Sequence, residues 1–146
     1  ISHLDSHLGV LARRPEFFDL YLDLALEFAL PVRLSSADTE RAVGFPFRSL
    51  AAEEGVIFPD HHVSSPGVGA RRTVEAAVAD LAPGVTELHL HPAIDTPEQR
   101  AFDPCWSQRV DDHHLLCFDT ELPDLLRSAG AILIGYRELR DLQRAG

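Results

Sequence analysis

Short strand-like segments alternate with helical segments about five times along this chain of 146 residues, which restricts the folds that it can adopt. Such alternation is typical of βα units, which build a parallel sheet or part of a barrel. We therefore predict an α/β fold in a single domain over residues 1–146, a partial (β/α) barrel of about five parallel strands. The last strand, a continuous apolar run, is expected to be buried on both faces. The expected strands are residues 2–8, 31–35, 56–58, 85–91 and 131–135.

Helical spacing of apolar residues marks the segments between these strands. Phe17, Leu20, Leu24 and Phe28 recur at intervals of three and four residues, which predicts a helix over residues 15–30. The other expected helices are one or two short ones within residues 37–54, then 73–81, 104–118, 120–129 and 136–144. A loop is expected at residues 64–70, which contain one proline and two glycines.

Two imidazoles and a carboxylate share one face of the first expected strand. Because side chains alternate along a strand, His3, Asp5 and His7 lie on one side of residues 2–8 and the leucines lie on the other. Neutral imidazole and carboxylate are groups that bind metals and transfer protons. This face is therefore a candidate metal or acid–base site.

The fourth expected strand repeats this pattern. Glu87, His89 and His91 share one face of residues 85–91. In parallel α/β folds, ligands bind at the carboxyl ends of the strands, which is where His7 and His91 are expected. We therefore predict that the two polar-faced strands line one cavity.

The charge balance and the cysteines exclude some classes of partner and site. A formal net charge of −10 argues against general binding to nucleic acids and anionic membranes, both of which select basic surfaces. No apolar run approaches the ~20 residues of a membrane span. Cys105 and Cys117 lack the spacing of a disulfide framework, which favours a reducing compartment, and we expect a cytoplasmic protein.

Four short motifs resemble one family and occur in its order. The first is His-Leu-Asp-Ser-His at residues 3–7, and the second is Leu-Pro-Val-Arg at residues 30–33. The third is Glu-Leu-His-Leu-His-Pro at residues 87–92, and the fourth is Ile-Gly-Tyr-Arg-Glu-Leu at residues 134–139. Together they resemble the YdjC-like carbohydrate deacetylase family, which includes the chito-oligosaccharide deacetylases. The resemblance extends over nearly the whole chain.

This resemblance implies a fold, a reaction and a cofactor. Family members are similar to polysaccharide deacetylases and have an irregular (β/α) barrel. They remove the acetyl group from an N-acetylated amino sugar with a divalent metal, expected here to be Mg or Zn. The family's Asp-Asp-Phe-Gly motif and a further upstream histidine have no match in this sequence. The resemblance therefore implies the C-terminal half of such an enzyme, and the family's activity for the parent protein.

The resemblance also implies roles for individual residues. His7 matches a histidine that binds the family's metal, and His91 matches the histidine of the family's His-Pro motif. We expect His91 to act as the general acid toward the departing amine, because imidazole titrates near neutral pH. The alternative for each histidine is a structural side chain that hydrogen-bonds locally. Asp5 is expected either to orient a histidine or to cap a turn.

Three other polar residues have less defined roles. Arg33 is expected to hold a catalytic carboxylate in its ionised state, or else to lie at the surface. Asp60 is a candidate sugar contact at a strand end, with a solvated turn as the alternative. Glu87 is a second candidate substrate contact, with orientation of Arg33 or of a histidine, or a plain buried ion pair, as alternatives. The remaining histidines with an expected structural role are His3, His89, His113 and His114.

Two other functions stay open from the sequence. One is a different barrel metallohydrolase that acts on an ester, a phosphoester or a cyclic amide. The other is an inactive fragment or one subunit of an assembly, because half of a barrel exposes unpaired strand edges and apolar surface. The expected partners are a small carbohydrate substrate and either a second copy, giving a homo-oligomer, or a missing N-terminal portion.

Overall fold

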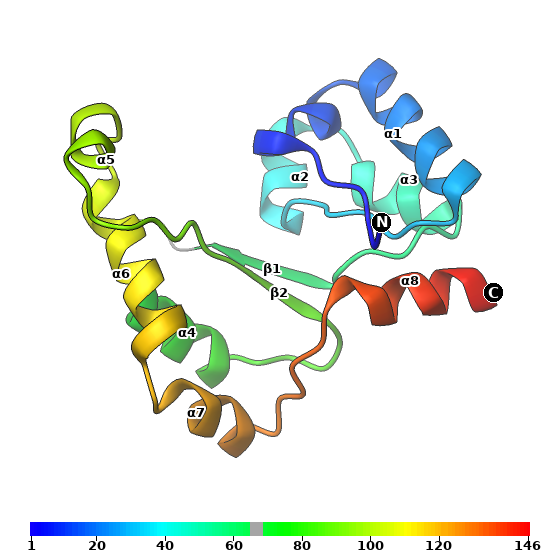
Figure 1. The fold of residues 1–146 in the computed structure, drawn as a ribbon. Helices are drawn as coiled ribbons and strands as arrows, with labels where there is room; N and C mark the ends of the chain where they lie inside the picture. The colour runs from blue at the N-terminus through cyan, green and yellow to red at the C-terminus, as the bar shows by residue number, and fades with distance from the viewer. Residues whose placement is uncertain (65–68) are drawn as a thin grey trace. The chain divides into compact units, whose positions relative to one another are not determined.

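The computed structural model describes residues 1–64 and 69–146, which form two compact units. The first unit comprises Ile1–His62 and Ile134–Gly146, and the second comprises Val63–Leu133. Figure 1 shows the helices and strands along the chain. In chain order they are the 3-10 helix η1 (His7–Arg13), α1 (Pro15–Phe28), α2 (Ala37–Val43), α3 (Phe47–Glu53), β1 (His61–Ser64), α4 (Ala70–Ala79), β2 (Thr86–His89), α5 (Pro97–Phe102), α6 (Trp106–Phe118), α7 (Leu122–Ser128) and α8 (Tyr136–Ala145).

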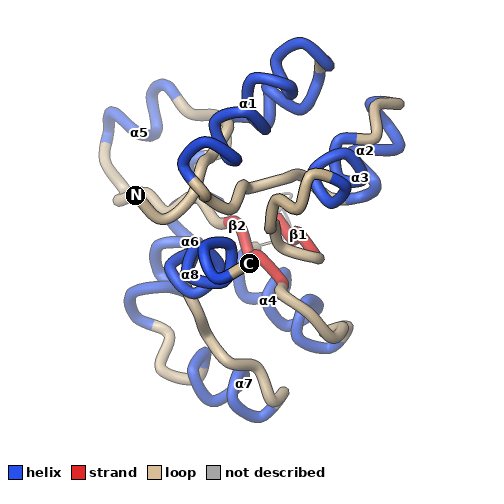
Figure 2. Tube along the Cα trace, turned by 90° about the vertical axis from the view of Figure 1, so that its right-hand side faces the viewer, coloured by secondary structure: helices blue, strands red, loops and turns tan. Residues whose placement is uncertain are grey.

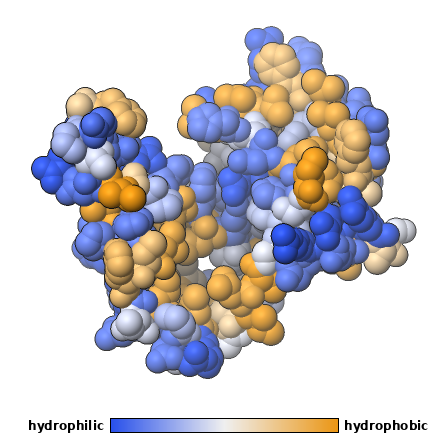
Figure 3. All heavy atoms as spheres, in the orientation of Figure 1, coloured by the Kyte–Doolittle hydropathy of each residue, from blue (hydrophilic) through white to orange (hydrophobic). Residues whose placement is uncertain are grey.

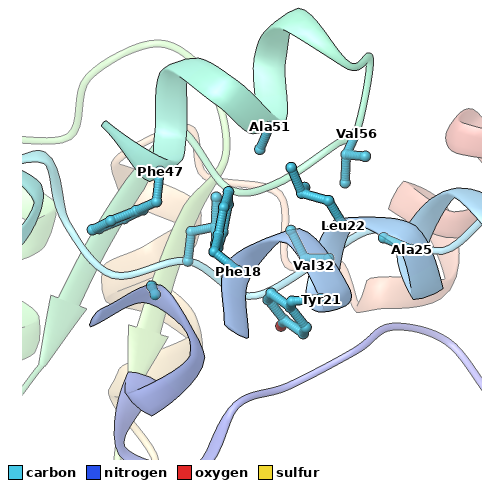
Figure 4. Packing of buried hydrophobic residues seen from close by; sticks show 10 residues of the cluster. Phe18, Tyr21, Leu22, Ala25, Val32, Phe47, Ala51 and Val56 are labelled. Atoms are coloured by element: carbon cyan, nitrogen blue, oxygen red, sulfur yellow. The ribbon is translucent and has the colours of Figure 1, made fainter. Parts of the chain in front are cut away.

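The core of the first unit forms around α1 and α3. One face of α1 is buried. Its side chains recur at helical spacing and are those of Phe18, Tyr21, Leu22 and Ala25. Figure 4 shows these side chains close to Phe47 and Ala51 of α3. The ring centroids of Phe18 and Phe47 lie 6.1 Å apart. The buried core residues are Ala12, Phe18, Tyr21, Leu22, Ala25, Val32, Leu34, Phe47, Ala51 and Val56.

Extended segments of the first unit pair at single residues. Leu4 forms an isolated parallel bridge with Val32, and the Val32 N–H donates to the carbonyl of Ile57 at 2.9 Å. At residues 31–35 and 56–58, where strands were expected, the structure describes no regular strand. A regular strand needs a ladder of such pairs, and these segments supply only its beginning.

The hydroxyl of Tyr21 joins α1 to two of these segments. The Leu4 N–H donates to the Pro31 carbonyl and the Arg33 N–H donates to the Leu4 carbonyl, both at 3.0 Å. The buried hydroxyl oxygen of Tyr21 lies 2.8 Å from the Leu4 carbonyl and 3.2 Å from the Arg33 carbonyl. The helix and both segments are therefore held at one point inside the unit.

The prediction of a strand over residues 2–8 is wrong at its carboxyl end. The Ser6 carbonyl accepts the Gly9 N–H at 2.7 Å and closes a turn. Leu8 and Gly9 have φ angles of 58° and 63°, in the left-handed region, which ends the extended conformation. His7 therefore begins η1 instead of ending a strand.

Side chains of α8 close the first unit. The Gln143 side chain accepts the Ile57 N–H at 2.6 Å and donates to the Gly55 carbonyl at 2.9 Å. Arg144 donates to the Ala29 carbonyl at 3.3 Å, directly after α1. These contacts bring the last helix against segments that lie far from it in the sequence.

A small sheet and a second core are formed by residues that follow α3 in the chain. β1 and β2 form a two-stranded parallel sheet, drawn in red in Figure 2. β1 begins in the first unit and ends in the second. Ala70 and Val74 of α4 and Leu115 of α6 form the buried core here. Partly buried side chains packed against it are Val78, Leu88, Leu90, Leu122 and Leu125.

The expected helices are all present, with ends displaced by up to a few residues. α1, α6 and α8 confirm the helices expected at residues 15–30, 104–118 and 136–144, and α2, α3, α4 and α7 confirm the others. α5 was not expected, although Thr96 and Pro97 are ordinary start signals. Within the part of the chain that the structure describes, no helix has both the length and the apolar character needed to span a membrane.

The expected strand at residues 131–135 is wrong. This segment has no regular secondary structure, and Ile132 and Leu133 are 85% and 87% exposed. An apolar run forms a buried parallel strand only where neighbouring strands accept and donate on both sides. Figure 3 shows apolar side chains in orange at the surface, next to polar ones in blue. The loop expected at residues 64–70 includes 65–68, which lie outside the described residues.

Phe18→Ala is expected to lower the free energy of unfolding by about 3–5 kcal/mol, because the ring is 0% exposed and its loss leaves a cavity. Phe17→Ala on the same helix is the matched control. Phe17 is 50% exposed, so its truncation should cost about 0.5 kcal/mol. Urea unfolding followed by circular dichroism measures both variants, and equal losses would contradict the assignment of the buried face.

Candidate functional site

Asp5 and Arg33, two predicted catalytic residues, form an ion pair in the first unit. Arg33 Nη1 lies 3.1 Å from Asp5 Oδ2. The bridge between Leu4 and Val32 brings them together, because each is the next residue along its segment. The pair is partly exposed, so it contributes modestly to stability. Its main consequence is that the carboxylate has a defined orientation.

His3 packs on Tyr136 at the start of α8. The two rings are nearly parallel, at 14°, and their centroids lie 3.8 Å apart. Ser2 Oγ lies 3.0 Å from His3 Nδ1, within hydrogen-bonding distance. The motifs at residues 3–7 and 134–139 therefore meet within the first unit.

His7 is exposed at the first position of η1. Ser6 holds the turn on both sides of it, since its carbonyl accepts the Gly9 N–H and its Oγ accepts the Leu11 N–H at 3.0 Å. The turn leaves the imidazole of His7 accessible to solvent and to a ligand.

Arg48, which no motif in the sequence marked, fixes the segment that carries Asp60. Its Nη2 donates to the Pro59 carbonyl at 2.8 Å and to the Asp60 carbonyl at 2.7 Å. Its guanidinium carbon lies 4.7 Å from the centroid of the Phe58 ring. Burial lowers the pKa of Arg48, while the carboxylates of Glu40 and Asp60 act in the opposite direction. The side chain of Asp60 itself is at an exposed position.

The second polar motif lies at and after β2 in the second unit. Glu87 and His89 are half-buried in β2, and His91 follows the strand at an exposed position. The ring centroids of His89 and His91 lie 4.3 Å apart, with the planes tilted by 39°. Alternation along an extended chain places these two imidazoles on the same side, as the sequence predicted.

A buried carboxylate that the sequence analysis did not select holds the backbone at His91. Asp112 of α6 is 1% exposed, and its Oδ2 accepts the His91 N–H at 2.8 Å. One turn earlier in α6, the Arg109 carbonyl accepts the Ala93 N–H at 3.0 Å. The only sequence signal was an acidic pair within a helix, where acidic side chains are ordinarily solvated.

A network of polar groups fixes the corner between α5 and α6. The Asp103 carboxylate pairs with Arg109 and accepts the Gln99 side-chain N–H at 2.9 Å. It also accepts the Cys105 N–H at 2.8 Å. The pKa of Asp103 is lowered first by this backbone N–H, and also by Arg109. Arg109 therefore uses its side chain to hold the corner and its carbonyl to hold Ala93.

A pocket of about 440 Å³ lies near the start of α4 in the second unit. Arg71 in its wall pairs with Glu75 at 2.7 Å, Asp119 at 2.6 Å and Glu121 at 3.3 Å. The hydrogen bond from Arg71 lowers the pKa of Asp119. Because three carboxylates surround this guanidinium, its charge is compensated within the protein. Other residues in the wall are Arg72, His114 and Phe118.

The predicted metal and acid–base residues belong to two units. Asp5, His7 and Arg33 are in the first, and Glu87 and His91 are in the second. Among the residues that the structure describes, no group of three or more His, Cys, Asp or Glu side chains is arranged to hold a metal ion. A catalytic metal centre typically has three protein ligands. The described residues therefore do not themselves fit a complete centre of this kind.

A family model for YdjC-like proteins matches residues 1–128. The match includes the polar motifs at residues 3–7 and 87–92. The chain belongs to the YdjC-like protein family.

One solved structure has a fold similar to that of the YdjC-like chain. It is a crystal structure from Enterococcus faecalis V583 of a protein named as a candidate cellobiose-phosphate cleavage protein, with a TM-score of 0.76 and 21% identity. The alignment covers 94% of this chain and 52% of that one, so the chain spans about half the length of that structure. At this identity the likeness shows the fold alone. No curated protein matches the chain.

The ion pair of Asp5 and Arg33 is expected to show a coupling energy of about 0.5–1 kcal/mol in a double-mutant cycle with alanine. The control pair is Arg14 and Glu16, which are both well exposed and 3.7 Å apart. Its coupling should be close to zero. Urea unfolding of the single and double variants measures both cycles. If the cycle shows no coupling, Arg33 does not hold the Asp5 carboxylate when the protein is in solution.

Proposed function

We propose that the protein is a metal-dependent hydrolase that removes N-acetyl groups from a small amino sugar or oligosaccharide. The YdjC-like match over residues 1–128 is the observation that carries this proposal. Both polar motifs lie within the match, and each presents imidazole or carboxylate groups in a fixed local arrangement. In this proposal residues 1–146 correspond to the C-terminal half of a (β/α) barrel.

His91 is the general acid of the proposed reaction. Hydrolysis of an amide requires a proton for the departing amine, and imidazole can supply one near neutral pH. His91 is exposed, so a substrate can reach it, and its backbone is held by Asp112. The neighbouring His89 ring limits the space on one side of the imidazole.

Three carboxylates have proposed roles in orientation and in substrate binding. Arg33 orients Asp5, which is assigned as a catalytic carboxylate that positions an imidazole or a water molecule. Asp60 and Glu87 are assigned to the sugar, since a carboxylate accepts hydrogen bonds from hydroxyl groups. The contacts of Arg48 with the backbone support this role for Asp60 by fixing its position.

His7 is the proposed ligand of a divalent metal, Mg or Zn. Such a metal would polarise the acetyl carbonyl and activate a water molecule. His7 is exposed and its turn is held by Ser6, which suits a ligand. Because the described residues do not gather three ligands, the proposed centre requires ligands beyond those brought together here.

A second candidate is a non-catalytic fragment or subunit of such an enzyme. Two observations favour it: the described residues lack a group of three metal-binding side chains, and the chain spans about half of the similar structure. In this case the chain acts with a partner, either a second copy or a polypeptide that supplies the rest of the fold. Acetate release by the chain alone, compared with the natural-length protein, distinguishes the two candidates.

His91→Ala is expected to lower the deacetylation rate about 10²–10⁴-fold and to leave the bound metal in place, because a general acid is lost and no ligand is removed. The measurements are acetate release from an N-acetylated amino-sugar disaccharide and metal content, both on the natural-length protein. His114→Ala replaces an exposed histidine of α6 and serves as the control. Loss of metal together with the rate would make His91 a ligand instead.

His7→Ala is expected to abolish tight metal binding, because the imidazole is the proposed ligand and alanine supplies no donor. Metal content after dialysis and titration with Zn²⁺ measure this in the natural-length protein. The same His114→Ala variant should bind metal as the unchanged protein does. Unchanged metal content in His7→Ala would show that the assignment is wrong.

A further inference from the structure

Asp112 places a carboxylate where solvent cannot reach it, and its two oxygens differ in their surroundings. Oδ2 accepts the His91 N–H at 2.8 Å. Oδ1 is buried and has no hydrogen-bond partner among the residues that the structure describes. A buried carboxylate with an unpaired oxygen is costly to folding. Such groups are retained chiefly where a site requires them, and the residue that Asp112 holds is His91.

The two backbone N–H groups of residues 91–93 both donate to α6. The His91 N–H donates to Asp112, and the Ala93 N–H donates to the Arg109 carbonyl. Pro92 between them has no N–H to donate. Alternate N–H groups of an extended segment point the same way, and positions three apart on a helix lie on one face. Residues 91–93 are therefore fixed along α6, and both of their backbone donors are used.

Apolar packing fixes the same segment from its other side. Leu88 and Leu90 alternate with His89 and His91, and both leucines pack against the core of Ala70, Val74 and Leu115. The leucine side of the segment is thus held by the core, and its backbone is held by α6. Rotation about its own side-chain bonds is the freedom that remains to the imidazole of His91.

We propose that Asp112 is a positioning residue for His91, and that it acts by accepting the His91 N–H from a buried site. The catalytic consequence rests on the proposed function of His91, whereas the hydrogen bond does not. An acceptor oxygen is required at position 112, so asparagine can replace aspartate and an apolar side chain cannot.

Amide hydrogen exchange on the chain of residues 1–146 tests the positioning directly. Asp112→Ala is expected to speed exchange of the His91 amide at least about tenfold, and Asp112→Asn should keep it within about threefold of the unchanged chain. If Asp112→Ala does not fold, Asp112→Leu removes the acceptor without leaving a large cavity and should show the same acceleration.

Val74→Ala is the control for a general loss of stability. Val74 is buried in the same core and contributes apolar contacts only. When the two variants are compared at equal stability, the His91 amide should exchange more slowly in Val74→Ala than in Asp112→Ala. Unchanged exchange in the variants without an acceptor, or equal acceleration in Val74→Ala, would overturn the proposal.

Kinetics on an N-acetylated amino-sugar disaccharide test the catalytic consequence in the natural-length protein. Asp112→Ala should lower kcat about 10–100-fold with KM within about twofold, and Asp112→Asn should restore most of kcat. Faster exchange at His91 with unchanged kcat would overturn the catalytic consequence. If even the unchanged protein releases no acetate, the proposed function fails, and hydrogen exchange still decides whether Asp112 positions His91.

Discussion

The hydrogen bonds between Leu4 and residues 31–33 are the contacts on which the polar part of the first unit depends. They align two segments that are distant in sequence, and the Tyr21 hydroxyl ties both of them to the buried face of α1. Asp5 and Arg33 each follow a residue of the bridge, so their side chains meet as a consequence of backbone pairing. The ion pair is thus an outcome of the fold and contributes little to holding it together.

Arginine connects side chains to the backbone at several places in this structure. Arg48 reaches the carbonyls of Ser35, Pro59 and Asp60, and Arg144 reaches the end of α1. A guanidinium has five N–H donors in a planar fork, so one side chain can satisfy several carbonyls at once. A lysine would keep the charge and lose this geometry. The chain has no lysine, and arginine supplies every one of these contacts.

Most of the helices were predictable because their signals are local, although α5 was not expected. Pro15 at the first turn of α1 and the spacing of its apolar residues lie within the helix itself. A strand depends on distant neighbours, and residues 131–135 show that an apolar run does not supply them. For the site, both Asp5 and Arg33 were candidates, since charged side chains can be recognised by type. Asp112 was not a candidate, because its partner is the backbone N–H of a residue 21 positions away. Almost every residue carries such a group, so the sequence does not mark it.

The division of the chain into residues 1–62 with 134–146, and 63–133, has a consequence for biosynthesis. The helix α8 leaves the ribosome after the other described elements, and its contacts with Gly55 and Ile57 close a loop that contains the whole second unit. The second unit can therefore fold before α8 is available to complete the first unit. Contacts of such long sequence separation slow folding, so the nascent first unit is the part most exposed to chaperones and proteases.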